Sequence, residues 1–526
     1  MIRIEERPKG IEGWNALVRF EGGSEYPITI RSPFSGRDEE RLEWYFEQHL
    51  RFPFTRQIEA RETAASITAY GEALFRQVFS DRRVYTEYLL IRDAGLSSLQ
   101  IEIAGSPAFH ALHWEALKDP DIPLPLVLQA TMVRKNIAPQ VMPAAMRPSP
   151  TINVLLVTAR PSGKQDVGYR TISRPLLEVL RRAQLPVQVD ILRPGTYRAL
   201  AEHLRNVSSQ NGDGHYHVIH FDVHGSVLTY EQLQEGQDAN KLLYQAHRYG
   251  RDDIGPFEGG KAFLFLEGEK DNHADAVDAT EIAHLLLGHH IPIAILNACQ
   301  SGKQIGTSET SIGSRLMHVG VQLVLAMGYS ITVSAAMLLM QTLYEQLFAN
   351  QDLPKAIQQA RLELYNHKER QAYFNQTIDL EDWLLPVVYQ NREQHLTVRA
   401  FTPEEARTYY ERQAAHYAPP QPSYGFVGRD LDILQIEKRL LTRRNALLIR
   451  GMGGAGKTTL LQHLGGWWQS TGFVTQVFYF GFDERAWTRQ QLLASIANRL
   501  LDPAQYVRDF QPLSLDAQHH IQPGGG

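Results

Sequence analysis

Short apolar runs alternate with amphipathic segments through the middle of the chain. The apolar runs predict strands at residues 152–158, 187–192, 217–221, 262–266, 291–297, 321–327 and 383–389. The amphipathic segments predict helices at residues 173–184, 196–206, 278–289, 309–319, 331–349 and 352–367. Because strands that are apolar along their whole length are buried on both faces, this alternation predicts an α/β fold. We expect a mainly parallel sheet with helices on both faces.

The region that precedes this series has a mixed pattern. Residues 1–150 combine strand-like stretches at 16–20 and 98–103 with a helical run at 64–79. We expect them to form an N-terminal α/β part beside a main domain of residues 151–391.

The region that follows the series predicts a linker and a second domain. Residues 392–423 are polar and rich in proline near their end, which is typical of a stiff linker. Residues 424–526 then return to an α/β pattern. Its predicted elements are helices at 430–441 and 457–469 and strands at 446–450 and 474–482. Two strands are fewer than a stable sheet needs, so we expect this domain to be incomplete.

Composition narrows the class of protein. With 526 residues, 43% hydrophobic and 21% charged, the chain has the composition of a globular protein of two or three domains. A net charge of −5 gives no basic field for nucleic acid, and no apolar run approaches the ~20 residues that span a bilayer. The single cysteine forms no intrachain disulfide, and the charged amino terminus is no secretory signal, so we expect a cytoplasmic protein.

Two of the predicted strands end in residues that can react. One strand leads to His224 and Gly225, and another leads to Cys299. The carboxyl ends of parallel strands share one edge of a sheet, where reacting groups collect. We therefore expect His224 and Cys299 to lie close together.

A histidine beside a cysteine can create a nucleophile. A thiol of pKa ~8.5 is mostly protonated at neutral pH, so an imidazole must take its proton and later give it to the leaving amine. The backbone N–H groups of Gly225 and Cys299 could form an oxyanion hole. No acid can be assigned to orient His224, because Asp222 lies two strand steps away, about 6.6 Å.

The residues alone leave a second interpretation open. A lone cysteine is commonly a small buried side chain, and His224 is one of 20 histidines. Cys299 would then be part of a core, and His224 a polar residue at the end of a strand.

The two strand ends resemble those of a known family, the CHAT proteases, which are caspase-like and belong to the same broad clan as separase. Residues 220–225 resemble its H-F-x-x-H-G motif, and residues 296–302 resemble L-N-A-C-x-S-G. Residues 113–115 resemble its P-W-E element, with His113 in place of proline, and residues 356–364 its A-x-x-x-A-R helix. The resemblance implies a caspase-like fold and a cysteine protease with His224 and Cys299 as the catalytic pair.

The resemblance also suggests residues for substrate binding. Arg160 stands where caspases place a basic residue for an acidic P1 side chain. Asp252 and Asp253 could instead favour a basic P1 side chain, as in separase-like relatives. The alternative for each is an ordinary solvated charge. The two aspartates lie in a long polar insert, residues 226–260, which we expect to be a mobile or occluding loop.

A phosphate-binding motif lies in the C-terminal region. Residues 451–458 read GMGGAGKT and fit G-x-x-x-x-G-K-[ST] between a predicted strand and a predicted helix. Backbone N–H groups and the helix dipole would meet phosphate oxygens, while Lys457 reaches the β/γ-phosphates and Thr458 holds Mg²⁺. The predicted nucleotide-binding residues are Gly451, Gly453, Gly454, Gly456, Lys457, Thr458, Thr459 and Arg429.

The segment before this motif, residues 425–429, resembles one that borders the nucleotide base in STAND-type signalling ATPases. The Walker B acid of that family is not recognisable, since Asp483 and Glu484 follow Lys457 too closely in sequence. We expect ATP and Mg²⁺ to bind without efficient hydrolysis, and proteolysis to need no cofactor.

These patterns and resemblances predict a caspase-like endopeptidase that cleaves a protein partner under control of a nucleotide-binding switch, in bacterial defence or programmed cell death. Expected partners are the protein substrate, a sensor or activator protein, and further copies of the chain through the NTPase domain. No nucleic acid or membrane partner is expected. The alternatives are a non-catalytic caspase-fold scaffold whose P-loop domain drives assembly, and a P-loop ATPase with a regulatory front module.

Overall fold

The chain divides into two compact units in the computed structural model. Unit 1 comprises Met1–Phe401 and Asp430–Leu447, and unit 2 comprises Thr402–Arg429 and Leu448–Gly526. The helix predicted at 430–441 therefore groups with the first 401 residues. The residues described are 1–8, 13–23, 25–137, 146–162, 166, 168–180, 186–236, 242–245, 251–268, 270, 272–298, 311–350, 352–373, 376–393, 395–396, 398–414, 417–420, 425–442, 446–483 and 485–513.

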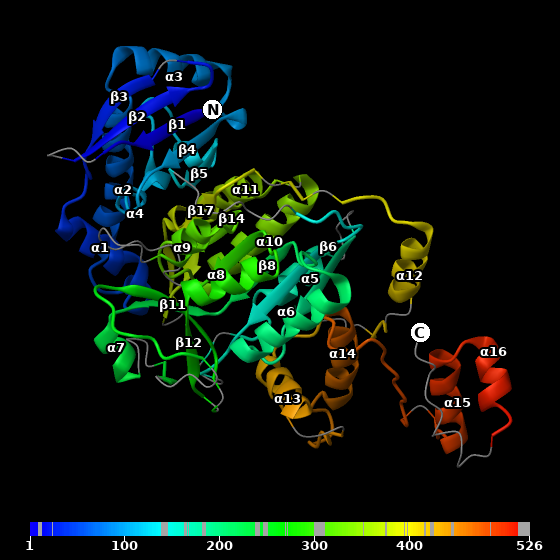
Figure 1. Ribbon diagram of the computed structural model, residues 1–526. Helices are drawn as coiled ribbons and strands as arrows, with labels where there is room; N and C mark the ends of the chain where they lie inside the picture. Colours follow the sequence, from blue (N-terminus) through cyan, green and yellow to red (C-terminus); the bar gives the residue numbers. More distant parts are fainter. Residues whose placement is uncertain are drawn as a thin grey trace. The chain divides into compact units, whose positions relative to one another are not determined.

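An 11-stranded sheet runs through the described part of unit 1 (Figure 1). Its strands, in spatial order, are β3 (Glu25–Ile30), β2 (Trp14–Phe20), β1 (Ile2–Glu6), β4 (Gln100–Ala104), β5 (Thr131–Lys135), β17 (Pro386–Gln390), β14 (Leu323–Met327), β13 (Ile293–Asn297), β8 (Val218–Asp222), β6 (Ile152–Thr158) and β7 (Val187–Ile191). β2 is antiparallel to both neighbours and β17 is antiparallel to β14, whereas the other pairs are parallel. The predicted mainly parallel sheet is confirmed, and β1 to β5 extend it.

The central strands of this sheet are buried on both faces. Every residue of β6 is buried. Leu155 and Val157 join a large apolar cluster on one face, and Val154 and Leu156, at the alternate positions, face the other side. The uninterrupted apolar runs in the sequence reflect this burial on two sides.

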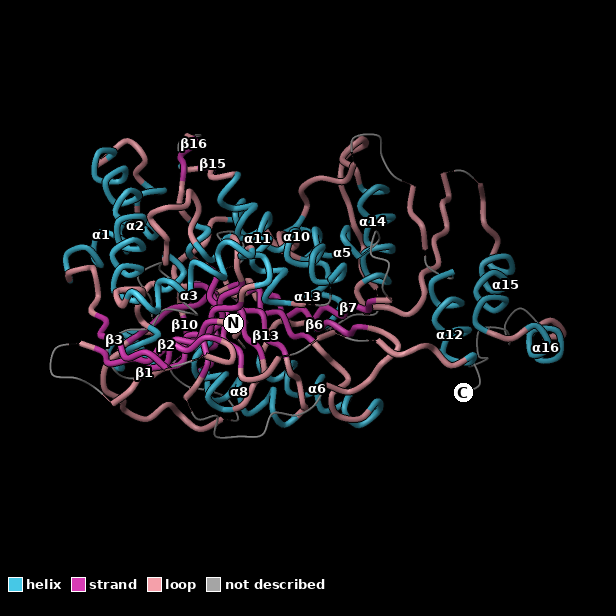
Figure 2. The backbone as a smooth tube through the Cα atoms, turned by 90° about the horizontal axis from the view of Figure 1, so that it is seen from above, coloured by secondary structure: helices cyan, strands magenta, loops and turns pink. Residues whose placement is uncertain are grey.

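Helices cover both faces of the sheet, with α2, α5, α10 and α11 on one face and α6 and α8 on the other (Figure 2). The helices of unit 1 are α1 (Gly36–Glu47), α2 (Gln57–Val78), α3 (Arg82–Ala94), α4 (Pro107–His110), α5 (Ser173–Leu180), α6 (Tyr197–Asn211), α7 (Tyr230–Glu235), α8 (Ala279–Gly288), α9 (Ile312–Val319), α10 (Val333–Asn350), α11 (Leu353–Asn366) and α13 (Asp430–Thr442). Its short 3₁₀ turns are η1 (His49–Arg51), η2 (Leu96–Ser98), η3 (Trp114–Ala116), η4 (Leu126–Leu128) and η7 (Asp382–Leu384). Of the helices described here, none is both long enough and apolar enough to cross a bilayer.

A second, four-stranded sheet follows the end of β8. Its order is β10 (Tyr244–Gln245), β12 (Ala274–Asp278), β11 (Lys261–Glu267) and β9 (His224–Leu228). β11, which we expected in the main sheet, pairs here with β9 and β12 because the chain turns back after β8. The insert 226–260, expected to be a loop, thus contributes the last three residues of β9, together with α7 and β10. A separate hairpin is formed by β15 (Glu369–Gln371) and β16 (Thr377–Asp379).

Two further motifs of the CHAT resemblance are buried inside unit 1. Trp114 is fully buried, and Oε2 of Glu115 lies 2.5 Å from Nη2 of the buried Arg134 of β5. Arg361 of α11 is buried as well and donates a hydrogen bond to the carbonyl oxygen of Pro386. These side chains tie helices and turns to the sheet.

The described residues of unit 2 form helices and no strand. They contain α12 (Pro403–Ala414), α14 (Lys457–Ser470), α15 (Arg489–Leu500), α16 (Pro503–Gln505) and the π-helical turn η8 (Tyr506–Phe510). The strands predicted at 446–450 and 474–482 are therefore wrong: these segments make no ladder. Strands are stabilised by their neighbours, and two alone do not make a stable sheet.

Candidate active site

Two neighbouring strands bring the predicted reactive segments to one edge of the main sheet. β8 and β13 are parallel, and Asn297 pairs with Asp222 in register. His224 comes two residues after Asp222 and begins β9. Ala298, which follows β13, is buried. The expected adjacency of the two strands is confirmed, and Cys299 itself lies outside the described residues.

His224 is hydrogen-bonded to a carboxylate. Its Nε2 lies 2.6 Å from Oδ1 of Asp166. The His224 side chain is 37% exposed, whereas the Asp166 side chain is fully buried. One ring nitrogen is thus fixed by a buried acid while the ring remains accessible, which is how a general base is oriented.

The surroundings of Asp166 favour its ionised form. Burial by itself raises the pKa of Asp166, but the hydrogen bond and charge of His224, the charge of Arg160 and the backbone N–H of Ser162 outweigh it and hold the pKa below 3.8. An ionised carboxylate only accepts hydrogen bonds, so His224 donates from Nε2. Nδ1 then carries the lone pair and is the nitrogen that can take a proton.

Sequence reasoning missed Asp166. It follows β6, which is parallel to β8 and ends at the same edge of the sheet. An acid after the carboxyl end of a third parallel strand is the signal that could have found it. The path of the intervening turn, however, cannot be read from periodicity.

Arg160 is enclosed within the protein. Its side chain is 4% exposed, with Nη2 2.5 Å from Oδ2 of Asp222 and Nη1 2.8 Å from the Asp222 carbonyl oxygen. Oδ1 of Asp222 accepts a hydrogen bond from Asn297 Nδ2 at 3.0 Å. A guanidinium that is buried and paired in this way does not support the predicted role in binding an acidic P1 side chain. The carboxylate of Asp222 is bonded to Arg160 and Asn297, whereas the acid that is bonded to His224 is Asp166.

Three other predicted residues lie in or near the second sheet. Gly225 is the second residue of β9 and pairs with Leu264 of β11 in register. Asp252 and Asp253 are exposed. Their roles, as oxyanion donor and as substrate-binding acids, stay predictions.

The phosphate-loop motif forms an exposed turn that leads into α14 of unit 2. Gly454 and Gly456 have φ of 75° and 78°, a left-handed conformation that glycine adopts at no steric cost. Nζ of Lys457 donates hydrogen bonds to the carbonyl oxygens of Gly451 and Met452, at 2.9 and 2.7 Å. The ammonium group of Lys457 therefore lies against the backbone of the loop that precedes it.

The predicted nucleotide-binding residues lie together in unit 2. Arg429 Nη2 donates to the carbonyl oxygen of Ala455 at 2.8 Å, and Thr458 and Thr459 stand in the first turn of α14. A Cβ added at Gly453, Gly454 or Gly456 would meet nothing within 4 Å, so the backbone is open to a ligand. Lys457 begins a 14-residue helix, and the role of this loop in binding a nucleotide stays a prediction.

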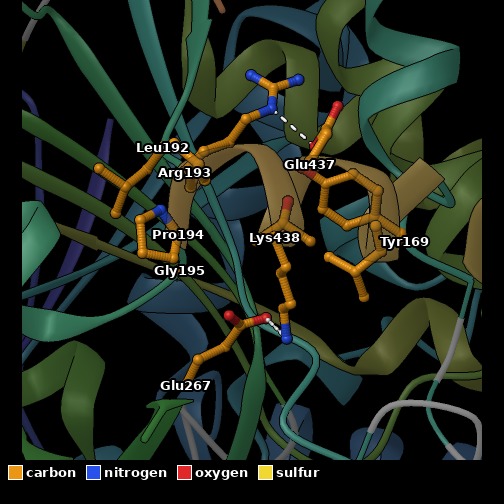
Figure 3. A pocket seen from close by; sticks show the side chains of 11 residues that line it. Tyr169, Leu192, Arg193, Pro194, Gly195, Glu267, Glu437 and Lys438 are labelled. Carbon is orange, nitrogen blue, oxygen red and sulfur yellow. Dashed lines mark hydrogen bonds and ion pairs between the residues drawn. The ribbon is translucent and has the colours of Figure 1, made fainter. Parts of the chain in front are cut away.

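Helix α13 is anchored in unit 1 by a buried carboxylate (Figure 3). Glu437 is 2% exposed, and its Oε2 lies 2.9 Å from Arg193 Nε and 2.8 Å from the Tyr169 hydroxyl. The Arg193 side chain is 4% exposed. Breaking a pair buried this deeply is costly, so α13 is held firmly to the main sheet's edge at β7.

Two further ion pairs extend this contact towards the candidate site. At the start of α13, Asp430 pairs with Arg170 at 2.7 Å. Lys438 pairs with Glu267 of β11 at 3.0 Å, as Figure 3 shows. Oε1 of Glu267 also accepts a hydrogen bond from the backbone N–H of Arg160, at 3.3 Å. A continuous set of polar contacts thus joins α13 to the residues around Asp166.

Comparison with known proteins identifies one family. The family model of the CHAT domain matches residues 68–419. No curated protein sequence matches the chain significantly.

Several solved structures are similar at low identity. The Arg-specific cysteine proteinase gingipain R shares 10% identity at a TM-score of 0.34, covering 70% of this chain and 77% of that one. The complex of the RgpB pro- and mature domains from Porphyromonas gingivalis shares 9% at 0.33, covering 70% and 78%. Separase in the Saccharomyces cerevisiae separase–securin complex shares 11% at 0.30, covering 56% of this chain and 15% of that one. The chain thus spans about a seventh of the separase chain, and similarities this low say nothing of function.

The pH dependence of stability tests the Asp166–His224 contact. Because the pKa of Asp166 is lower in the folded protein, its ionised form contributes stability above pH 3.8, and this contribution is lost as the pH falls below that value. Asp166→Asn should therefore be less stable than wild type at pH 7, and the difference should shrink towards zero in strong acid. Thermal unfolding between pH 3 and pH 7 measures this. A difference that persists unchanged at the acid end would contradict it.

Proposed function

The chain belongs to the CHAT family, since the family model matches residues 68–419, more than half of its length, and on this basis we propose that it is a caspase-like cysteine endopeptidase that cleaves a protein partner. One observation carries the proposal: His224, hydrogen-bonded to Asp166, lies two residues after the end of β8, and β8 is the neighbour of the strand that leads to the single cysteine. Family membership supports a cysteine peptidase independently of this geometry.

Register and covalent geometry support the pairing of His224 with Cys299. The two residues each follow the matched pair Asp222 and Asn297 by two positions. Neighbouring strands lie about 4.8 Å apart, and Cys299 is joined to Ala298 with their Cα atoms about 3.8 Å apart. These limits are compatible with direct contact between the thiol and Nδ1 of His224.

The proposed reaction is acyl transfer through the thiol. Nδ1 of His224 takes the thiol proton, and the Cys299 thiolate bonds to the scissile carbonyl carbon, with Asp166 stabilising the imidazolium. N–H groups of Gly225 and Cys299 would face the oxyanion. The C–N bond then breaks as His224 gives its proton to the amine, and water, deprotonated by His224, releases the acyl group from sulfur.

We further propose that a nucleotide bound in unit 2 controls this protease. The glycine loop and Lys457 would hold the phosphates of ATP, with Mg²⁺ at Thr458. Arg429 contacts the loop within unit 2, and the next residue, Asp430, pairs with Arg170 within unit 1. One peptide bond therefore joins the loop's contact to the anchored helix α13.

The biological setting follows from the resemblance to STAND-type ATPases. We propose a cytoplasmic signalling protease of bacterial defence or programmed cell death, which a sensor or activator protein switches on. Further copies of the chain could associate through the nucleotide-binding unit.

Loss of either reacting residue should abolish cleavage. Cys299→Ala and His224→Ala should each remove peptide hydrolysis, and because the two act as a unit the double variant should be no worse than either. Mass spectrometry of newly formed protein termini, in cells with wild type and with each variant, measures this and identifies the substrate. Folding should be unchanged by circular dichroism. Persistent cleavage by a well-folded Cys299→Ala protein would refute the protease, and no cleavage by wild type would favour the scaffold.

Removal of the loop cation should weaken nucleotide binding. Lys457→Ala should raise the Kd of a fluorescent ATP analogue by about tenfold or more, because a charged hydrogen-bond donor to phosphate contributes roughly 1.5–3 kcal/mol. Basal proteolysis should stay intact. Arg508→Ala, which removes an exposed cation elsewhere in unit 2, is the control and should leave binding unchanged. Equal binding by wild type and Lys457→Ala would contradict the nucleotide site.

The anchor of α13 should transmit the effect of nucleotide. Glu437→Gln keeps the shape but removes the charge that Arg193 pairs with, and should lower the free energy of unfolding by roughly 1.5–3 kcal/mol. Cleavage measured with and without ATP and Mg²⁺ should then respond less to nucleotide than in wild type. Gln435→Ala, at an exposed position of the same helix, should keep the full response. An undiminished response in Glu437→Gln would argue against control through α13.

A further inference from the structure

We propose that Arg160, Asp222 and Asn297 form a positioning network that fixes the ends of three strands and so sets the geometry of His224 and Cys299. This inference rests on the proposed peptidase, and it names what holds the reacting pair in place. None of the three side chains needs to touch the substrate.

The network lies where the main-chain pairing of three strands stops. The ladder between β8 and β13 reaches its last pair at Asp222 and Asn297, and the ladder between β8 and β6 reaches its last pair at Asp222 and Thr158. Beyond these pairs the chain leaves the main sheet and continues as β9, which pairs with β11. Side chains must therefore hold the strand ends together from this point onwards.

One carboxylate provides both ties. Oδ1 of Asp222 accepts from Asn297, at the end of β13, and Oδ2 accepts from Arg160, which follows β6. Arg160 also donates to the main-chain carbonyl of Asp222, so that it grips both the backbone and the side chain of β8. In sequence, His224 and Cys299 are the second residues after Asp222 and Asn297, so these ties fix the two strand ends just before the proposed reacting pair.

The burial of Arg160 and Asp222 means that their contact tolerates little change in geometry. The side chains of Arg160 and Asp222 are 4% and 7% exposed, so neither charge can be satisfied by bulk water. Each must keep its partner at hydrogen-bond distance. The positive charge of Arg160 also favours the ionised form of Asp166, which orients the ring of His224.

Alkylation of the single cysteine tests the network without any substrate. The rate at which iodoacetamide modifies the full-length protein, followed against pH, reports the thiolate of Cys299 alone. In wild type the profile should show an apparent thiol pKa below ~8.5, and in Arg160→Gln the pKa should rise towards that value. With a peptide that the wild-type protein cleaves as substrate, Arg160→Gln should lower kcat by about 100-fold relative to wild type and leave KM within about twofold.

Paired variants separate positioning from folding. Asp222→Asn should shift the alkylation profile in the same direction as Arg160→Gln, and the double variant, which buries no unpaired charge, should recover part of the wild-type profile and stability. Asn297→Ala removes one tie without changing charge and should lower kcat as well. If Arg160→Gln does not fold, the double variant and Asn297→Ala still decide the matter.

A matched control removes a comparable ion pair elsewhere. Arg370 of β15 and Asp382 of η7 are both buried, with Nε and Oδ2 2.5 Å apart, so Arg370→Gln should lower stability yet leave the alkylation profile unchanged. Variants of the network that behave like Arg370→Gln would overturn the proposal. A changed preference for the P1 side chain with an unchanged alkylation profile would also overturn it, and return Arg160 to substrate binding. Absence of proteolysis in wild type would refute the peptidase alone, since the alkylation profile is read without cleavage.

Discussion

A single residue, Val223, separates the main sheet from the second sheet. β8 ends at Asp222 in a parallel ladder between β6 and β13, and β9 begins at His224 in an antiparallel ladder with β11. The backbone on both sides of Val223 is therefore fixed by strands of different sheets. This constraint leaves His224 almost no freedom of main-chain movement, while its ring stays partly exposed. Backbone pairing on both sides of Val223 thus restrains the main chain at His224 and leaves its ring accessible.

The buried guanidinium of Arg160 lies among several carboxylates at this junction. Arg160 lies against Asp222, and its charge helps to keep Asp166 ionised, while its backbone N–H meets Glu267. One buried cation thus has three carboxylates around it. Burial alone raises the pKa of Asp166, and the charge of Arg160 helps to offset that rise. The tautomer of His224, and hence the nitrogen that is left to accept a proton, depends on a charge that does not itself touch the ring.

Much of this architecture could be predicted from the sequence, because burial on two faces leaves long apolar runs. The strands that lead to His224 and towards Cys299 were visible for that reason, and their adjacency follows from parallel pairing. Asp166 was not visible, since its position depends on the path of a turn. Arg160 was noticed as a candidate either for substrate binding or for a solvated charge, and its pairing with Asp222 could not be read from periodicity because it joins side chains of different strands. The strands expected at 446–450 and 474–482 failed for a related reason: their apolar pattern was present, but neighbours to pair with were absent from the described residues.

The nucleotide control that we propose would run through α13. α13 lies between two segments of unit 2 in sequence, but its contacts place it in unit 1. Arg429, at its start, contacts the glycine loop, and Asp430 and Lys438 pair with unit 1. A helix transmits displacement along its axis better than a flexible linker, because its backbone hydrogen bonds keep its length fixed. In the control that we propose, a change at the loop that moves Arg429 would act on α13, whose Lys438 pairs with Glu267, and Glu267 accepts a hydrogen bond from the backbone of Arg160 beside the strand ends that lead to His224.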